Sequence, residues 1–177
     1  DIKALIFNRG PGAFSGIRIN TAVVQALSVA HDIPCVGVSS LQAIAQCAYK
    51  KYGLTQVYSA LDARMQQVYF GQYPILGDVA DNSIMQPVLA HDSDSTEQLL
   101  DYDSQTELDI PIVGNGALLL KAYDGQVCHE DVWPDAVVIG QLGIAQFMNV
   151  GGTDAANALP RYLRNQAWKT LKEQGKA

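Results

Sequence analysis

The chain has 177 residues, of which 48% are apolar and 17% are charged, and its net charge is −6. This composition supports a folded core and excludes a disordered tail, while the acidic balance argues against a stand-alone nucleic-acid binder with a basic footprint. No apolar run reaches the ~18 residues of a membrane span and no signal peptide is evident, so we expect a cytoplasmic protein without membrane contact. Three widely spaced cysteines predict free thiols, with neither a disulfide framework nor a zinc site.

The chain opens on Asp1 and enters an apolar strand almost at once. We therefore expect that a segment of the protein precedes it; loss of the initiator methionine alone is the alternative. Because an apolar strand with an open edge attracts another chain, we also expect an altered homodimer or aggregation.

Residues 1–53 alternate between strand and helix patterns. The predicted elements are strands over 2–7 and 35–38 and helices over 15–31 and 40–52. Ser39 and Ser40 offer an N-cap for the second helix, and Gly53 closes it. Strands separated by helices favour a parallel sheet, so we assign 1–53 to a first α/β lobe.

Residues 54–177 differ in character and are assigned to a second lobe with a terminal segment. The predicted elements are a hairpin of 57–61 and 68–73 around Asp62-Ala63-Arg64-Met65, strands at 83–89 and 110–113, and helices at 95–102, 117–123 and 135–149, with a short polar helix after Arg164. Residues 61–135 carry fourteen acidic and two basic residues, a net charge of −12. A stretch of this charge repels nucleic acid.

A glycine-rich segment, Arg9-Gly-Pro-Gly-Ala-Phe-Ser-Gly16, joins the first strand to the first helix. Glycines let a backbone approach a ligand, and the N–H groups at a helix N-terminus attract anions, so Gly10, Gly12 and Arg18 are candidates for a phosphate loop. The segment has neither a Walker nor a Rossmann pattern, and a tight structural turn is the alternative.

The helix over 15–31 has two faces that both lack charge. Its wider apolar stripe, which includes Ile19, Val23 and Leu27, is expected to face the sheet. The opposite face carries no carboxylate or lysine, which favours a protein partner over solvent; cover by the rest of the domain is the alternative. The predicted partner contacts are Ile17, Asn20, Thr21, Val24 and Ser28.

Four segments resemble the TsaB (YeaZ) family of tRNA threonylcarbamoyladenosine biosynthesis proteins. They are Arg9–Arg18, Pro34–Leu41, Leu61–Met65 with Val68-Tyr69, and Pro160–Arg164, in that order along the chain. The resemblance implies an actin-like ATPase (ASKHA) fold of two ribonuclease-H-like lobes. The family begins with a strand hairpin, an Asp-Thr motif and a long helix that are absent here, which implies that the first lobe is incomplete.

The resemblance further implies a role in threonylcarbamoyl transfer to an adenosine of tRNA. The catalytic paralogue TsaD holds a metal through a His-x-x-x-His pair, which aligns with Ser40 and Ile44, so we expect no metal site and no catalysis here. The implied partners are TsaD, the ATPase TsaE and a second copy of the chain, with tRNA bound only indirectly. We expect no cofactor, since ATP binding without the missing hairpin would be weak.

Two other functions remain open. One is enzymatic, either an actin-like-fold ATPase or a glycoprotease-type peptidase, and the other is a scaffold with unrelated partners. Asp62 is interpreted as a turn former, and Gly114-Asn115-Gly116 resembles a turn that contacts adenosine in actin-like ATPases.

Overall fold

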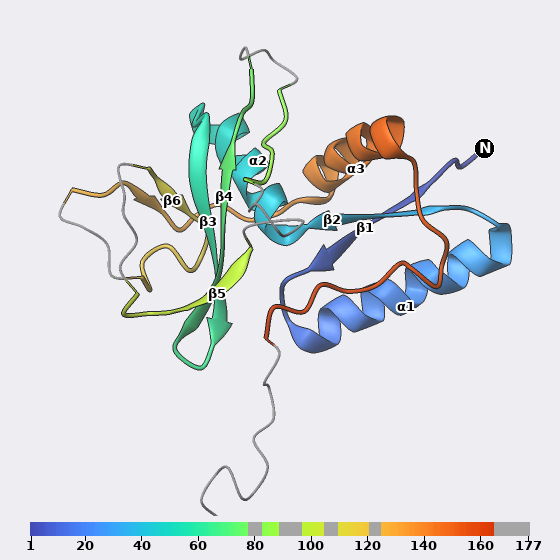
Figure 1. The fold of residues 1–177 in the computed structure, drawn as a ribbon, viewed down its shortest axis with the longest axis horizontal. Coiled ribbons are helices and arrows are strands. Elements are labelled where there is room, and N and C mark those ends of the chain that lie inside the picture. Colours follow the sequence, from blue (N-terminus) through green and yellow to red (C-terminus); the bar gives the residue numbers. More distant parts are fainter. Residues whose placement is uncertain (78–82, 89–96, 105–109, 121–124, 165–177) are drawn as a thin grey trace, which may run out of the picture.

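The computed structural model describes residues 1–77, 83–88, 97–104, 110–120 and 125–164. These residues form two sheets that lie side by side with a helix between them (Figure 1). Among the helices of the described residues, none combines the length and the hydropathy needed to cross a bilayer.

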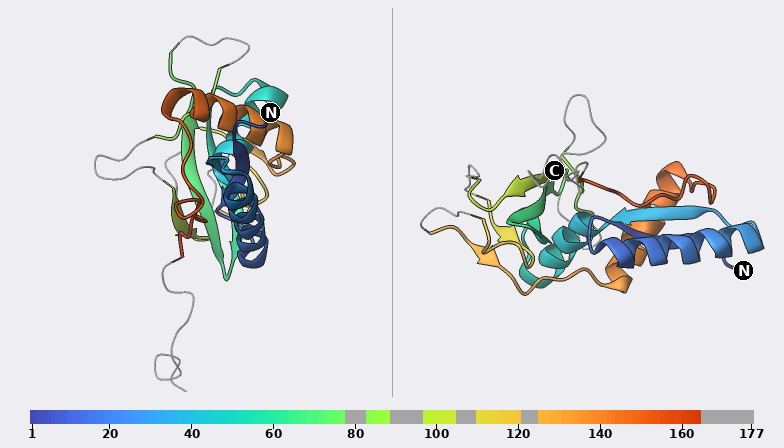
Figure 2. Two further views of the ribbon diagram at one scale, coloured as in Figure 1. Left: turned by 90° about the vertical axis from the view of Figure 1, so that its right-hand side faces the viewer. Right: turned by 90° about the horizontal axis from the view of Figure 1, so that it is seen from below.

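The first sheet has two parallel strands. The elements are β1 (Leu5–Gly10), α1 (Phe14–His31), β2 (Cys35–Ser39) and α3 (Ala136–Val150). The helices α1 and α3 lie on opposite sides of the strands (Figures 1 and 2) because successive β1 side chains point to opposite faces. Phe7 packs with Val24 of α1, whereas Ile6 packs with Leu142 of α3.

The second sheet has five strands in the order β5-β4-β3-β6-β7. Their bounds are β3 (Gln56–Arg64), β4 (Gln67–Pro74), β5 (Gln98–Asp101), β6 (Ile112–Val113) and β7 (Cys128–His129). The strands β3, β4 and β5 are antiparallel neighbours, while β6 runs parallel to β3 and to β7. The predicted hairpin is confirmed.

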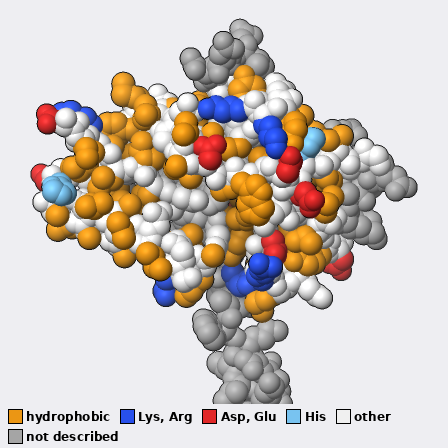
Figure 3. Space-filling view, turned by 180° about the vertical axis from the view of Figure 1, so that it is seen from behind, with side chains coloured by type: hydrophobic (Ala, Val, Ile, Leu, Met, Phe, Trp, Pro, Cys, Tyr) orange, Lys and Arg blue, Asp and Glu red, His pale blue; other side chains and the backbone are white. Residues whose placement is uncertain are grey.

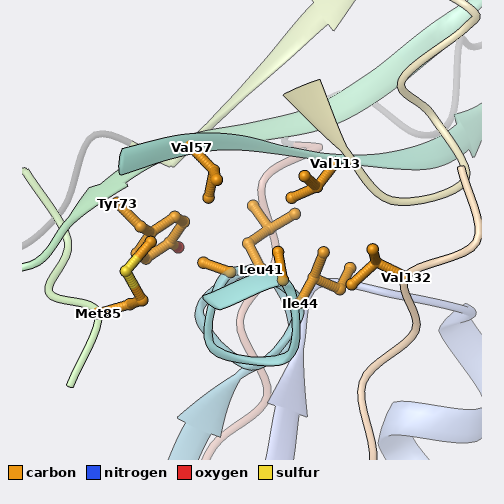
Figure 4. Packing of buried hydrophobic residues seen from close by; sticks show 9 residues of the cluster. Leu41, Ile44, Val57, Tyr73, Met85, Val113 and Val132 are labelled. Atoms are coloured by element: carbon orange, nitrogen blue, oxygen red, sulfur yellow. The ribbon is translucent and has the colours of Figure 1, made fainter. Parts of the chain in front are cut away.

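The helix α2 (Ser40–Tyr52) connects the two sheets and fills the space between them. Ser39 caps it by accepting from the backbone N–H groups of Leu41 and Gln42, and Gly53 ends it in the left-handed conformation, both as predicted. Its apolar side chains Leu41 and Ile44 are fully buried against Val57 and Val113 of the second sheet (Figure 4).

The predicted boundary at residue 53 lies between the strands of the two sheets. The helix α3, however, comes after this boundary and packs on the first sheet. This helix packs on β1 and β2, where a Cβ at Gly143 would lie 2.2 Å from Ile6 Cγ2, so a glycine is needed at the crossing. The chain therefore returns to the first sheet after it has formed the second. Local sequence patterns do not predict this packing, because α3 and β1 are far apart in the sequence.

Three predicted elements of the second half are wrong in the described residues. At 83–88 the chain forms the isolated bridge Ile75–Met85 rather than a regular strand. Its backbone donates to the Pro74 and Gln72 carbonyls and also bonds the side chains of Gln42 and Gln46 of α2. Residues 98–101 form β5 instead of helix, since pairing with β4 overrides helical periodicity. Residues 115–119 form turns rather than the start of a helix. The helix predicted after Arg164 lies outside the described residues.

Candidate functional site

A cavity of about 560 Å³ opens where the glycine-rich segment, the β3–β4 hairpin and the chain's later residues meet. Apolar and aromatic side chains form much of its wall, and Asp62 is its one lining carboxylate among the described residues. Its lining residues include Gly12, Phe14, Asp62, Asn115, Tyr162 and Arg164. A recess of this size and composition suits a small organic ligand.

Asp62 is held by the hairpin turn, as the sequence analysis predicts. Its Oδ1 accepts from the backbone N–H of Arg64 at 2.8 Å, and its Oδ2 lies 2.9 Å from Arg64 Nη1. Tyr102 also donates to Oδ1 at 3.1 Å. Met65 and Gln66, between the strands, have φ near +55° and +60°, the geometry of a tight two-residue hairpin turn. These contacts make Asp62 a structural group at the rim of the cavity.

The Gly114-Asn115-Gly116 turn packs directly on β3. Asn115 Oδ1 accepts from the backbone N–H of Asp62 at 3.0 Å, and the Gly116 N–H donates to the Ala60 carbonyl at 3.0 Å. A Cβ at Gly114, where φ is +102°, would lie 2.4 Å from the Ala60 oxygen. Only glycine fits this approach, and the turn thereby places Asn115 in the cavity wall.

Arg164, the last described residue, hydrogen-bonds the β3–β4 hairpin. Its Nη2 donates to the carbonyl oxygens of Ala63 and Arg64 at 3.1 and 3.3 Å and to Gln67 Oε1 at 2.9 Å. The guanidinium thus closes one side of the cavity through backbone carbonyls, a role that its position in the sequence did not reveal.

The three candidates for a phosphate loop have different surroundings in the structure. Gly12 lines the cavity, but the Gly10 N–H donates to Asn8 Oδ1 at 2.8 Å and so turns inward. Arg18 lies over the Phe14 ring at 4.2 Å and donates through Nε to the Tyr162 hydroxyl at 3.0 Å. The segment thus forms the turn into α1, with Gly12 in the cavity wall and Arg18 against two other residues of that wall.

Ser40 and Ile44, which the resemblance aligns with a metal-binding pair, have other contacts in the structure. Ser40 donates from Oγ to Asn8 Oδ1 at 2.7 Å, and Ile44 is buried in the core around α2 (Figure 4). His129 stacks on Tyr52, with ring centroids 4.1 Å apart. In the part of the chain that the structure describes, no three His, Cys, Asp or Glu side chains are grouped to hold a metal ion.

A buried polar cluster, consisting of Ser39, Tyr73, Glu97 and Arg161, connects the two sheets. Ser39 and Tyr73 both donate to Glu97 Oε1, the latter at 2.6 Å, and Arg161 Nε lies 3.8 Å from Glu97 Oε2. The Glu97 side chain is only 3% exposed. Sequence analysis did not find this cluster because its four members come from four separate segments, and an isolated Glu97 gives no local signal.

The cluster predicts a pH dependence of stability. Burial, and next the Glu97 carboxylate, raise the pKa of Tyr73 well above its ordinary value of 10.0. Above pH 10 the unfolded chain loses this proton while the folded chain keeps it. The free energy of unfolding therefore falls as pH rises from 10 toward the folded-state pKa, by up to about 1.4 kcal/mol per pH unit.

Denaturant unfolding of the wild type and of Tyr73→Phe between pH 8 and 11 measures this dependence. We expect the decline above pH 10 to be shallower in the variant, because phenylalanine has no proton to lose. Parallel curves for the two proteins would contradict the assignment to Tyr73.

The predicted orientation of α1 is wrong. Ile17, Thr21, Val24 and Ser28 are buried and form the seam that packs inward, with Asn20 donating to the Asn8 carbonyl at 2.8 Å. The residues expected to face the sheet are exposed instead, namely Ile19 at 65%, Val23 at 53% and Leu27 at 43%. Because both faces lack charge, apolar content alone cannot tell which one meets the sheet, and the small Thr21 and Ser28 permit the closer approach.

The chain is similar to known proteins over most of its length. The family model described as "TsaD: tRNA N6-adenosine threonylcarbamoyltransferase" matches residues 1–172. The tRNA threonylcarbamoyladenosine biosynthesis protein TsaB of Escherichia coli K12 is 33% identical over 183 residues, covering 97% of this chain and 75% of the relative. TsaB of Haemophilus influenzae is 30% identical, covering 96% and 74%.

Solved structures agree with these relatives. YeaZ from Pseudomonas aeruginosa superposes with a TM-score of 0.76 at 30% identity, covering 91% of this chain and 75% of that one. A second structure, described as an uncharacterized protein with similarity to peptidase YEAZ from Pseudomonas aeruginosa, gives a TM-score of 0.75 at 29% identity, covering 92% and 74%. The two-sheet α/β architecture is the actin-like fold of two ribonuclease-H-like lobes. The chain therefore belongs to the TsaB (YeaZ) family of tRNA threonylcarbamoyladenosine biosynthesis proteins.

Proposed function

We propose that this chain is a non-catalytic subunit that supports threonylcarbamoyl transfer to an adenosine of tRNA by pairing with a TsaD-type paralogue. The observation that carries the proposal is the exposed apolar face of α1, defined by Ile19, Val23 and Leu27. The sequence from Ile19 to Ala30 contains no Asp, Glu, Lys or Arg. A large apolar face without charge is typical of a protein interface rather than of a solvated helix.

The surface around α1 supports the same proposal. Figure 3 shows hydrophobic side chains spread over the half of the back surface where α1 lies, with the charged side chains of that half near its margins. The partner contacts predicted at Ile17, Thr21, Val24 and Ser28 are replaced in the proposal by Ile19, Val23 and Leu27, because the former are buried. A second copy of this chain would compete for the same face.

The side chains present favour a binding role over catalysis. Ser40 and Ile44 stand where the paralogue carries its metal-binding histidines, and both are engaged within this chain. Arg18 contacts the Phe14 ring and the Tyr162 hydroxyl. A nucleotide phosphate would have to compete with Tyr162 for the Arg18 guanidinium, so we expect the chain alone to bind ATP weakly. A TsaE-type ATPase and tRNA would then join through the assembled complex, the tRNA away from the acidic stretch of this chain.

The test is a titration of the TsaD-type protein of the same organism with wild-type chain and with Val23→Glu. In the complex the new carboxylate of this variant would lose its water without gaining a polar partner. We therefore expect the dissociation constant for the TsaD-type protein to rise at least about tenfold. Val23 is exposed, and the variant should therefore keep the wild-type melting temperature.

Leu118→Glu is the matched control, because Leu118 is also exposed and apolar but lies beside the second sheet, away from α1. It should bind the partner as the wild type does. Unchanged binding by Val23→Glu would place the interface elsewhere, and no binding by the wild type under conditions where the paralogue is folded would reject the pairing.

A further inference from the structure

A second recess lies on the first sheet, separate from the cavity described above. Its volume is about 260 Å³, and it is bounded by β1, β2, the end of α3 and the segment that follows α3. The polar residues of its wall are Arg9, Gln146, Thr153 and Asn157. Among the described residues that line it, Arg9 carries the one formal charge and no carboxylate is present.

Arg9 is short of partners in this recess. Its Nε is fully buried and has no hydrogen-bond partner, and no described carboxylate lies within 4 Å of its guanidinium. Its backbone is well held, with the carbonyl accepting from the Arg161 N–H at 2.7 Å. A guanidinium that is partly removed from water without a counter-ion is unfavourable unless an anion can reach it.

The described carboxylates of Glu97 and Asp154 are engaged with groups other than Arg9. The carboxyl of Glu97 lies beside Arg161, at 3.8 Å, and accepts from Tyr73 and Ser39. Asp154, in the segment that follows α3, is exposed, and its Oδ1 accepts from the Asn157 backbone and amide at 2.9 Å.

The backbone around Arg9 is shaped to admit its side chain. A Cβ at Gly37 would lie 3.1 Å from Arg9 Cδ and 3.2 Å from Arg9 Cβ, so the glycine of β2 leaves room for the arginine stem. A Cβ at Gly152 would lie 2.8 Å from Pro34 Cβ and 3.0 Å from the Cys35 carbonyl oxygen, so a second glycine lets the opposite wall approach β2. The site is therefore built by the fold rather than by a surface side chain.

We propose that this recess binds a small oxyanion, of the carboxylate or phosphate type, through the unpaired guanidinium of Arg9. The planar guanidinium matches the oxygen spacing of both groups, and Gln146 and Thr153 bring an amide and a hydroxyl to the same wall. The volume accommodates the anionic group of a small metabolite but not a nucleotide, so the ligand is a free small anion. This function is independent of partner binding by α1.

The probes are inorganic phosphate and acetate, titrated separately into the wild-type chain at constant ionic strength, with chloride as the reference. We expect a saturable rise in melting temperature with one of the two, and the stronger response identifies the class of anion. In Arg9→Gln the anion should bind at least about tenfold more weakly. This variant removes a half-buried guanidinium whose Nε has no hydrogen-bond partner, so without anion it should melt no lower than the wild type.

Arg18→Gln is the matched control, since Arg18 is exposed and lies outside the recess; its anion response should equal that of the wild type. A direct readout is the NMR signal of the Arg9 Nε–H, which should shift saturably with the anion in the unaltered chain. An Arg9 signal that does not move, or a response that persists in Arg9→Gln, would overturn the proposal even if that variant folds poorly.

Discussion

Replacement of Gly114 by alanine is expected to lower the free energy of unfolding by about 3 kcal/mol. At φ +102° an L side chain is strained, which accounts for about 1 kcal/mol of this loss. The added Cβ would also lie 2.4 Å from the Ala60 oxygen. That oxygen cannot retreat easily, because Ala60 is paired to Phe70 across the sheet and its carbonyl accepts from the Gly116 N–H.

Gly53→Ala is the matched control for this prediction. Gly53 also has a positive φ, at +69°, but a Cβ there would meet no atom within 4 Å, so only the backbone strain of about 1 kcal/mol should appear. Chemical denaturation of both variants measures the difference. Equal losses at the two glycines would show that the close approach to β3 contributes nothing.

Replacement of Glu97 by alanine should also cost about 3 kcal/mol of unfolding free energy, because it leaves buried partners without their acceptor. The Tyr73 hydroxyl loses a 2.6 Å hydrogen bond, and Arg161 loses the carboxylate at 3.8 Å. Ser39 retains its capping contacts with α2 but loses its bond to Glu97. The cluster connects β2, β4 and the later chain, so the loss should appear in the global unfolding transition.

A double-mutant cycle isolates the contact between Glu97 and Tyr73. Tyr73→Phe and Glu97→Ala should lose less together than the sum of their separate losses, since each removes the same hydrogen bond. Asp131→Asn is the control for charge alone, because its ion pair with Lys51 is exposed and should change the melting temperature little. Strict additivity in the cycle would contradict a direct Glu97–Tyr73 bond in solution.

Local signals in the sequence predicted the first half of the fold well. The helix α2 follows from the Ser39 cap and the Gly53 stop, and the β3–β4 hairpin follows from β-rich segments around Asp62. Each of these signals lies within a few residues of the element that it specifies, and the structure satisfies it by local hydrogen bonds. The interpretation of Asp62 as a turn former is confirmed for the same reason.

Nonlocal contacts explain where the sequence analysis was wrong. β5 forms because residues 98–101 find an antiparallel partner in β4, and no helical pattern within the segment can compete with that pairing. Arg18 donates to the hydroxyl of Tyr162, which lies 144 positions further along the chain, a contact that the sequence does not reveal. A separation of 101 positions likewise hides the approach of Arg164 to Ala63 of the hairpin.

The sequence by itself determined the fold class, the family and the low charge of α1, because composition, motifs and short-range caps are written in neighbouring residues. Only the tertiary structure decided which face of α1 is buried, since two uncharged faces differ little in burial energy until β1 and Phe7 select one. It also decided that Arg9 has no ion pair with a carboxylate of the described residues. Charge balance around a buried group depends on residues from several distant segments, and these meet only after the chain has folded.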